Sequence, residues 1–299
     1  MNGFLNILKP PGMTSAAVVG KVKRLTGEKH VGHAGTLDPE AAGVLPIMVG
    51  KATRLFDYLV DKEKEYVAEI AFGARTDTQD ATGHVLERGD RYPTFETVKE
   101  TVPRLEGDIL QKPGIYSAIK MDGRPLYERA RKGETVEIAA RPVHVESIRL
   151  ISEMPRHGML MVVRCGRGTY IRSLCEDLGD LCTCPAHMRF LLRSASGVFD
   201  LNTAMTLEEA AAFAAEGTLQ DHLLKPDMPL GHMPRVDVYD WAEKMVRAGA
   251  KLPPRAVKTD IDEGAVTRVY LQDVFWGIAE RQADGFAWCA QIAPEEESL

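Results

Sequence analysis

The sequence has no long apolar run, few cysteines and no surplus of positive charge. None of its apolar segments approaches the ~18 residues that a membrane-spanning helix needs, so a membrane protein is not expected. Residues 1–9 lack a basic stretch followed by a long apolar one, so we expect no signal peptide and a cytoplasmic location. Hydrophobic residues make up 44% of 299 residues, which suits one sizeable domain plus a small one.

The five cysteines are an odd number, which without an export signal argues against a disulfide framework. Two of them, Cys182 and Cys184, lie close to His187 in the sequence and raise the question of a metal site. Paired zinc ligands are usually separated by about two to four residues, whereas a single residue separates these cysteines. We therefore expect no metal and interpret the cysteines as buried, reduced thiols.

The charge balance is acidic, with a formal net charge of −6. Taken alone this argues against nucleic-acid binding, because phosphate contacts usually leave a basic footprint. Residues 112–197 nevertheless contain 14 Lys and Arg against nine Asp and Glu. A basic face on an acidic protein is therefore compatible with the sequence.

Local patterns predict several elements of an α+β protein. A helix should follow the Pro-Pro-Gly turn at residues 10–12, capped by Thr14 or Ser15 and stopped by Gly27. Residues 30–50 are rich in glycine and proline and predict a long loop, of the kind that is usually functional. Further on, the patterns predict a strand opened by Tyr66, a helix over 94–105 ended or kinked by Pro103, a strand over 160–165, a helix over 171–182, and a helix with a capping box at 206–209.

The turn-rich residues 225–234 predict a domain boundary, which divides the chain into domains 1–230 and 231–299. Short strands are expected at 266–271, 275–279 and 286–292, and tight turns separate them. Short strands with tight turns are typical of a small β-barrel or half-barrel. The larger domain alternates helices and strands irregularly, which favours an α+β fold around a mixed or antiparallel sheet.

Three local features could carry chemistry. Asp38 ends the glycine-rich run that begins at Gly32, although an aspartate before proline more often stabilises a turn. Tyr66 follows a charged stretch at the start of a strand, where a tyrosine more often belongs to the core or its rim. Arg172 lies at a helix start, where a cation is unfavourable to the helix dipole, so it either pairs with a carboxylate elsewhere or lies on the surface.

Together these features resemble the TruB family of tRNA pseudouridine synthases over roughly residues 6–198. The C-terminal residues 267–270 and 275–278 resemble, more weakly, a PUA-type RNA-binding module. The runs that carry the resemblance are Lys9-Pro10-Pro11-Gly12-Met13-Thr14-Ser15, Gly32-His33-Ala34-Gly35-Thr36-Leu37-Asp38-Pro39, Gly43-Val44-Leu45-Pro46, Gly50-Lys51-Ala52-Thr53, Lys64-Glu65-Tyr66, Gly73-x-x-Thr76-Asp77-x-x-Asp80-x-x-Gly83, Pro113-x-x-Tyr116-Ser117-Ala118-Ile119-Lys120, Gly168-Thr169-Tyr170-Ile171-Arg172, Gly179 to His187, and Leu191-x-Arg193.

The resemblance implies conversion of a uridine to pseudouridine at position 55 in the T loop of tRNA, without a cofactor. It implies that Asp38 is the catalytic carboxylate, that Tyr66 stacks on the extruded base, and that Arg172 pairs with Asp38. The expected substrate-binding residues are His33, Lys9, Lys64, Tyr170 and Leu191. Lys9 could equally be structural, with its stem packed on Pro10.

The expected partner is the T-arm of tRNA, with no obligate protein partner and a monomeric state. The residues leave open whether Asp38 attacks C6, attacks C1′ or assists elimination. Two other functions use the same residues. One is a non-catalytic RNA-binding protein or RNA chaperone, which has no need of the carboxylate. The other is an N-glycosidase that uses Asp38 with His33 and releases free uracil.

Overall fold

The computed structural model describes residues 1–59, 63–116, 120–121, 124–125 and 138–292. The chain forms two compact units, which are described separately. Unit 1 comprises Met1–Pro39, Gly43–Asp61 and Gly197–Leu299, and unit 2 comprises Glu40–Ala42 and Lys62–Ser196. The motif residues Ser117 to Ile119 lie outside the described residues.

Unit 2 is built on an antiparallel sheet with the strand order β12-β4-β11-β10-β7. Its smaller elements include two short hairpins and the helical segments that follow the first one. The strands of the main sheet are β4 (Lys64–Phe72), β7 (Gly107–Gln111), β10 (Arg141–Met154), β11 (Gly158–Cys165) and β12 (Ala186–Ser196). The smaller elements are β5 (Ala74–Thr76), β6 (Val85–Arg88), β8 (Lys120–Met121), β9 (Arg124–Pro125), α2 (Phe95–Thr101) and η2 (Val102–Leu105).

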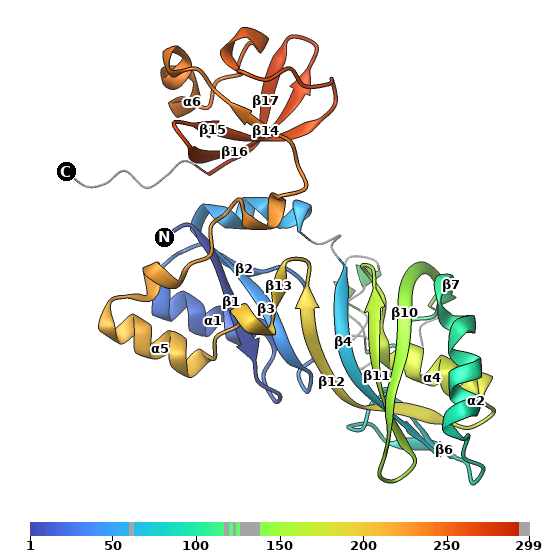
Figure 1. Ribbon diagram of the computed structural model, residues 1–299. Coiled ribbons are helices and arrows are strands. Elements are labelled where there is room, and N and C mark those ends of the chain that lie inside the picture. The colour runs from blue at the N-terminus through green and yellow to red at the C-terminus, as the bar shows by residue number, and fades with distance from the viewer. Residues whose placement is uncertain (60–62, 117–119, 122–123, 126–137, 293–299) are drawn as a thin grey trace. The chain divides into compact units, whose positions relative to one another are not determined.

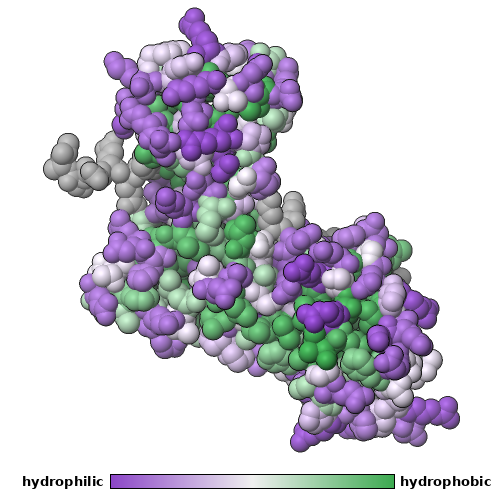
Figure 2. Space-filling view, in the orientation of Figure 1, coloured by the Kyte–Doolittle hydropathy of each residue, from purple (hydrophilic) through white to green (hydrophobic). Residues whose placement is uncertain are grey.

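One face of this sheet is covered by α4 (Ile171–Leu181), which packs against β12 and β4 (Figure 1). The helix buries Leu174, Cys175 and Leu178, which recur at helical spacing. Along β4 buried and half-buried residues alternate, as expected for a strand with only one covered face. Figure 2 shows hydrophobic residues gathered among hydrophilic ones over the sheet of unit 2.

The N-terminal part of unit 1 places β3 (Ala42–Val49) between β1 (Gly3–Lys9) and β2 (Val31–His33), with antiparallel pairing to both. The outer edge of β1 bonds to later parts of the chain, because Phe4 pairs with Leu224 and Ile7 with Met205. Helices α1 (Ser15–Thr26) and α5 (Leu207–Glu216) lie side by side (Figure 1). The 3-10 segments of this part are η1 (Gly50–Tyr58), η3 (Leu201–Thr203), η4 (Leu219–His222) and η5 (Met228–Leu230), and β13 (Phe199–Asp200) precedes η3.

The C-terminal part of unit 1 is a four-stranded sheet with the order β14-β15-β16-β17, in which only the first pair is parallel. It has a hydrophobic core of its own that includes Val236, Leu252, Trp276 and Phe286. Its elements are β14 (Arg235–Asp237), η6 (Asp240–Ala242), α6 (Glu243–Arg247), η7 (Pro254–Ala256), β15 (Val266–Leu271), β16 (Val274–Gln282) and β17 (Gly285–Gln291).

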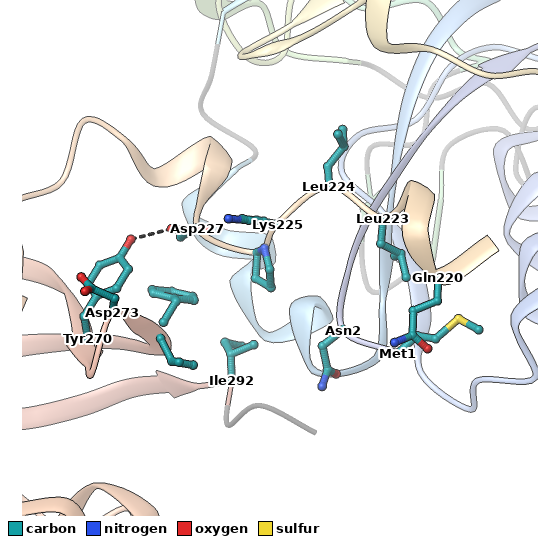
Figure 3. A pocket seen from close by; sticks show the side chains of 13 residues that line it. Met1, Asn2, Gln220, Leu223, Leu224, Lys225, Asp227, Tyr270, Asp273 and Ile292 are labelled. Carbon is teal, nitrogen blue, oxygen red and sulfur yellow. Dashed lines mark hydrogen bonds between the residues drawn. The ribbon is translucent and has the colours of Figure 1, made fainter. Parts of the chain in front are cut away.

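The segment that leads into this sheet is bonded to it. The Tyr270 hydroxyl donates a hydrogen bond of 2.6 Å to Asp227, and burial together with this carboxylate raises the pKa of Tyr270 to about 12. An open pocket beside the bond is lined by Leu223, Lys225 and Ile292, among others (Figure 3). A second core cluster of unit 1 contains both Phe4 and Ile292.

The predicted α+β class with a separate C-terminal sheet is confirmed. The helix after the first turn is capped by Thr14 and ends at Gly27, and the helix over 94–105 gives way to a 3-10 turn at Val102, next to Pro103. The predicted long loop over 30–50 is wrong in extent, because β2 and β3 occupy most of it. The boundary after residue 230 stays a prediction. Within the described ranges no helix is long and apolar enough to cross a membrane.

The cysteines are reduced, but they are not all buried. Cys182 is half-buried and Cys289 is exposed, while the other three are buried. Burial raises the pKa of both the Cys182 and the Cys184 thiol, which disfavours the thiolate that a metal would need. His187 Nδ1 lies 2.8 Å from the backbone oxygen of Ala74. In the part of the chain that the structure describes, no group of three or more potential ligands is gathered.

Asp177 on α4 is a carboxylate whose charge is disfavoured in the folded state of unit 2. Burial, with the neighbouring carboxylates of Glu176 and Asp180, raises the pKa of Asp177 to about 6. A folded-state pKa above the unfolded one contributes stability at low pH, and this contribution is lost as the pH rises through 6. We therefore expect Asp177→Asn to raise the free energy of unfolding at pH 8 by about 1 kcal/mol, after discounting for partial solvent exposure.

Urea unfolding of the wild type and the variant at pH 5 and pH 8 would measure this effect. The gain should be smaller at pH 5, and equal gains at both values would contradict it. Asp180→Asn is the matched control, because Asp180 forms an ion pair with Arg75. Its removal should not stabilise the protein at either pH.

Candidate active site

Asp38 belongs to unit 1 and lies in the loop over residues 34–41, whose last two residues are assigned to unit 2; its side chain is half-buried. The backbone of this loop is tied down on both sides of Asp38. The Ala34 N–H donates to Pro46 O at 3.0 Å. The Ser15 hydroxyl donates to Leu37 O at 3.0 Å and accepts from the Leu37 N–H at 2.9 Å. The loop is therefore a fixed support for the carboxylate.

Lys9 bonds to a third point of this loop, the residue immediately after Asp38. This lysine is fully buried at the end of β1, which is rare for a lysine. Its ammonium donates to Pro10 O at 2.8 Å and to Pro39 O at 2.9 Å. The described contacts support the structural alternative for Lys9, whereas its contact with RNA stays a prediction.

The variant Lys9→Met keeps the length of the buried stem but removes the donor to Pro39. We expect it to lower kcat by about tenfold or more, because a displacement of the loop moves the Asp38 carboxylate away from its working position. The KM for the RNA should change by less than about twofold if Lys9 acts only through the loop. Steady-state kinetics measures both quantities. A raised KM with unchanged kcat would instead indicate a direct contact with the substrate.

His33 is the last residue of β2, where it pairs with Ile47 of β3 and is half-buried. It therefore stands directly before the loop that carries Asp38. In unit 1, Asp38 therefore lies in the loop and His33 lies directly before it. Lys9 bonds to the backbone of the loop at Pro39. The predicted RNA contact of His33 stays a prediction.

Tyr66 is the third residue of β4 in unit 2 and only 7% exposed. Its neighbour in register on β12 is Arg193, and Leu191 of the same strand pairs with Ala68. Residues two apart on a strand share a face, so Tyr66 and Leu191 lie on one face of the sheet. Arg193 is fully buried. Its burial could not be predicted, because nothing in the neighbouring sequence distinguishes a buried arginine in a strand from an exposed one.

The strand that carries Tyr66 starts two residues earlier than predicted, at Lys64. Lys64 is half-buried and pairs in register with both Cys165 of β11 and Ser196 of β12. Strand pairing on both sides therefore fixes its backbone.

Tyr170 precedes the first residue of α4 and is clamped by a side chain of β7. Its N–H donates to Gln111 Oε1 at 2.7 Å, and Gln111 Nε2 donates to Tyr170 O at 3.0 Å. Gln111 is buried. One side-chain amide can accept from the N–H and donate to the C=O of the same residue only if the amide and that residue are held in fixed positions. Gln111 was missed by the sequence analysis, since its partner lies 59 residues away.

Arg172 is the second residue of α4 and is 6% exposed, so the surface alternative is wrong. Its Nη1 donates to Thr78 O at 3.2 Å and its Nη2 to Tyr116 O at 3.1 Å. The guanidinium is thus held by two backbone carbonyls from different segments of unit 2. Its pairing with Asp38 stays a prediction.

Unit 2 accordingly contains five of the eight predicted site residues, and unit 1 contains the other three. Those of unit 2 are Lys64, Tyr66, Tyr170, Arg172 and Leu191. The structure also reveals the side chains that hold them, of which Ser15 and Gln111 are the clearest cases. Unit 1 thus offers a carboxylate on a fixed loop, and unit 2 offers a buried aromatic ring and a guanidinium held by two carbonyls.

Comparisons with known proteins match most of the chain to one family. The family model described as the N-terminal domain of TruB family pseudouridylate synthases matches residues 23–171. The model described as the C-terminal domain of tRNA pseudouridylate synthase B matches residues 172–230. The chain is 43% identical over 279 residues to tRNA pseudouridine synthase B of Alkaliphilus oremlandii, which covers 93% of this chain and 92% of the relative. It is 41% identical over 258 residues to the protein of the same name from Bacillus subtilis, which covers 84% of each.

Solved structures show the same fold. A Cbf5-Nop10-Gar1 complex contains a chain that matches with a TM-score of 0.71 at 26% identity, covering 98% of this chain and 84% of that one. An archaeal box H/ACA sRNP Nop10-Cbf5 complex gives a TM-score of 0.74 at 24% identity, covering 98% and 87%.

Proposed function

The chain belongs to the TruB family of pseudouridine synthases, and from this premise we propose that it converts uridine to pseudouridine at position 55 in the T loop of tRNA. The observation that carries the proposal is the loop at residues 34–41, whose backbone is tied on both sides of Asp38. The printed name of the relatives, tRNA pseudouridine synthase B, supports tRNA as the substrate.

The reaction is an isomerisation and needs no co-reactant. The N1–C1′ bond of the uridine breaks, the base turns, and a C5–C1′ bond forms. The hydrogen on C5 is lost as a proton, and N1 gains one. Atoms and electrons balance within the substrate, so the side chains need only to extrude, hold and polarise the base.

Asp38 acts in this proposal as the carboxylate that assists cleavage of the glycosidic bond, either as a nucleophile or as an ion-pair partner. Arg172 pairs with it and keeps it ionised when the base displaces water. Tyr66 stacks on the extruded base, a contact worth about 1–3 kcal/mol, which offsets the cost of unstacking.

The remaining predicted residues complete the binding site in this proposal. His33 holds the loop around the extruded nucleotide, Tyr170 and Leu191 line the base pocket, and Lys64 contacts the RNA. The C-terminal sheet adds a PUA-like contact to the RNA. We propose that the chain acts as a monomer without an obligate protein partner.

The test is to incubate the purified chain with an unmodified tRNA transcript and to map pseudouridine by position. We expect modification at position 55 alone, and none when this uridine is replaced by cytidine. Modification at another position would contradict the proposed site, while release of free uracil would indicate an N-glycosidase. Failure of the purified chain to act, with activity restored by a cell extract, would indicate a required partner.

A further inference from the structure

The turn after β5 supplies one of the two carbonyls that hold Arg172. Arg172 Nη1 donates to Thr78 O, and the turn around Thr78 is closed by its own side chains. The Thr76 hydroxyl donates to Asp80 O at 2.7 Å, and the Thr78 hydroxyl donates to the Asp80 carboxylate at the same distance. These bonds shape the turn, but they do not attach it to the helix that carries Arg172.

That attachment is made by Gln79. Its amide oxygen accepts a hydrogen bond of 3.0 Å from the Ser173 hydroxyl, and its amide nitrogen donates to Glu176. Ser173 and Glu176 both lie on α4, so one side chain bonds two points of that helix. The other oxygen of Glu176 accepts from Arg75 at 2.6 Å, which fixes the carboxylate. The Gln79 carbonyl accepts from the Met188 N–H of β12 at 3.0 Å.

The same amide lies against the segment that supplies the second carbonyl. A Cβ atom added to Gly114 would come within 2.5 Å of Gln79 Oε1, so the backbone of Gly114 lies directly on this group. Two residues later, Tyr116 O accepts from Arg172 Nη2. Gln79 therefore touches both segments that hold Arg172 and the helix that carries it.

The backbone of Gln79 shows that this placement is imposed by its surroundings. Its φ is +63°, in the left-handed region that a glutamine rarely adopts. Such conformations cost on the order of 1 kcal/mol or more and persist only where the surrounding structure fixes them. Here the bonds to Ser173, Glu176 and Met188 fix it.

We propose that Gln79 is a positioning residue, which sets the Arg172 guanidinium by holding both of its carbonyl acceptors against helix α4. The proposal rests on the proposed function, in which Arg172 acts on Asp38. A guanidinium held by two carbonyls is displaced if either segment moves, and a displacement of about 1 Å can cost on the order of a hundredfold in rate.

The test replaces Gln79 with glutamate, which has nearly the same shape but places a second carboxylate next to that of Glu176. We expect Gln79→Glu to lower kcat by about tenfold and to leave KM within about twofold. The defect should shrink between pH 8 and pH 6, because a proton shared by the two carboxylates restores the bond. In the double variant Gln79→Glu with Glu176→Gln, the amide and carboxylate exchange places, and kcat should return to within about threefold of wild type.

Gln220 offers a control. It is an exposed residue of η4 in unit 1 and has no role in the proposed site. Gln220→Glu makes the same chemical change away from the site, and kcat should not change. Gln79→Asn keeps an amide that tolerates the left-handed region but is too short to reach α4. Gln79→Asn should lower kcat although it places no second carboxylate next to Glu176.

A wild-type kcat for Gln79→Glu would overturn the proposal. A lowered kcat would also overturn the proposal if the double variant did not restore it and if it varied only with the melting temperature of the variants. Such a result would show that Gln79 has a merely structural role. The proposed function fails separately, if Asp38→Asn or Arg172→Lys keeps full turnover. Loss of turnover in those two variants with none in Gln79→Glu would overturn the positioning role alone.

Discussion

Replacing Asp38 with asparagine is expected to abolish pseudouridine formation, with a loss of roughly 10⁴-fold or more in the single-turnover rate. The amide has nearly the same shape as the carboxylate, so the ties of the loop through Ser15 and Lys9 should remain. What is lost is the negative charge at the glycosidic bond. RNA binding should stay within about threefold of wild type, because a positioned carboxylate does not attract phosphate.

Two measurements check this expectation: pseudouridine content by mass spectrometry and RNA affinity by filter binding. Glu40→Gln is the control, since Glu40 is an exposed carboxylate only two residues after Asp38. It should retain the wild-type rate. Turnover by Asp38→Asn above about one per cent of wild type would remove Asp38 from the chemistry.

Replacing Arg172 with lysine is expected to lower kcat by about a hundredfold, although the positive charge is kept. The guanidinium donates through separate nitrogens to Thr78 O and Tyr116 O, whose carbonyls belong to different segments. A single ammonium cannot reproduce this planar, two-ended arrangement. In the proposed pairing the positive charge would therefore move away from Asp38, and the pH–rate profile should differ from that of wild type.

Arg189→Lys makes the same substitution at a matched position. Arg189 also donates to two backbone carbonyls, Pro155 O at 3.0 Å and Arg156 O at 3.1 Å. It forms an ion pair with Glu69 and has no predicted role in the reaction. Its kcat and its pH–rate profile should equal those of wild type. An unchanged profile for Arg172→Lys would argue against its pairing with Asp38.

The elements that the sequence predicts well are those with local signals. The ends of α1 are set by Thr14 and Gly27, which contact residues only three or four positions away. The capping box at Thr206 and Glu209 is equally local and is present. The strand character of residues 42–49 was missed because β3 is defined by its pairing with β1, about 40 residues earlier, and with β2.

In the candidate site, too, the residues with local signals could be predicted from the sequence, and the residues with distant partners could not. The motif around Asp38 is visible in the sequence, although from spacing alone it reads as a turn. The residues that hold the site are not visible, because Gln79 and Gln111 act through partners that lie far away in the sequence. For Lys9 the sequence left an RNA contact and a structural role equally open, because the carbonyl of Pro39 that its ammonium bonds lies 30 residues away.

The division into units has a consequence for synthesis of the chain. Apart from residues 40–42, unit 2 is one continuous segment, and Lys64 near its start pairs with Ser196 at its end. The five strands of its main sheet can pair with one another once residue 196 has left the ribosome. Strand β1, in contrast, needs Met205 and Leu224 at its edge, and Phe4 shares a core cluster with Ile292.

At roughly 5–20 residues per second, the residues from 196 to Leu224 take about 1–6 s to leave the ribosome. We therefore expect the middle of the chain to fold first, while the first strand waits with an unpaired edge that can associate with other chains. A truncation that removes Met205 and Leu224 should accordingly leave the edge of β1 open to association with other chains, although β1 lies at the other end of the sequence.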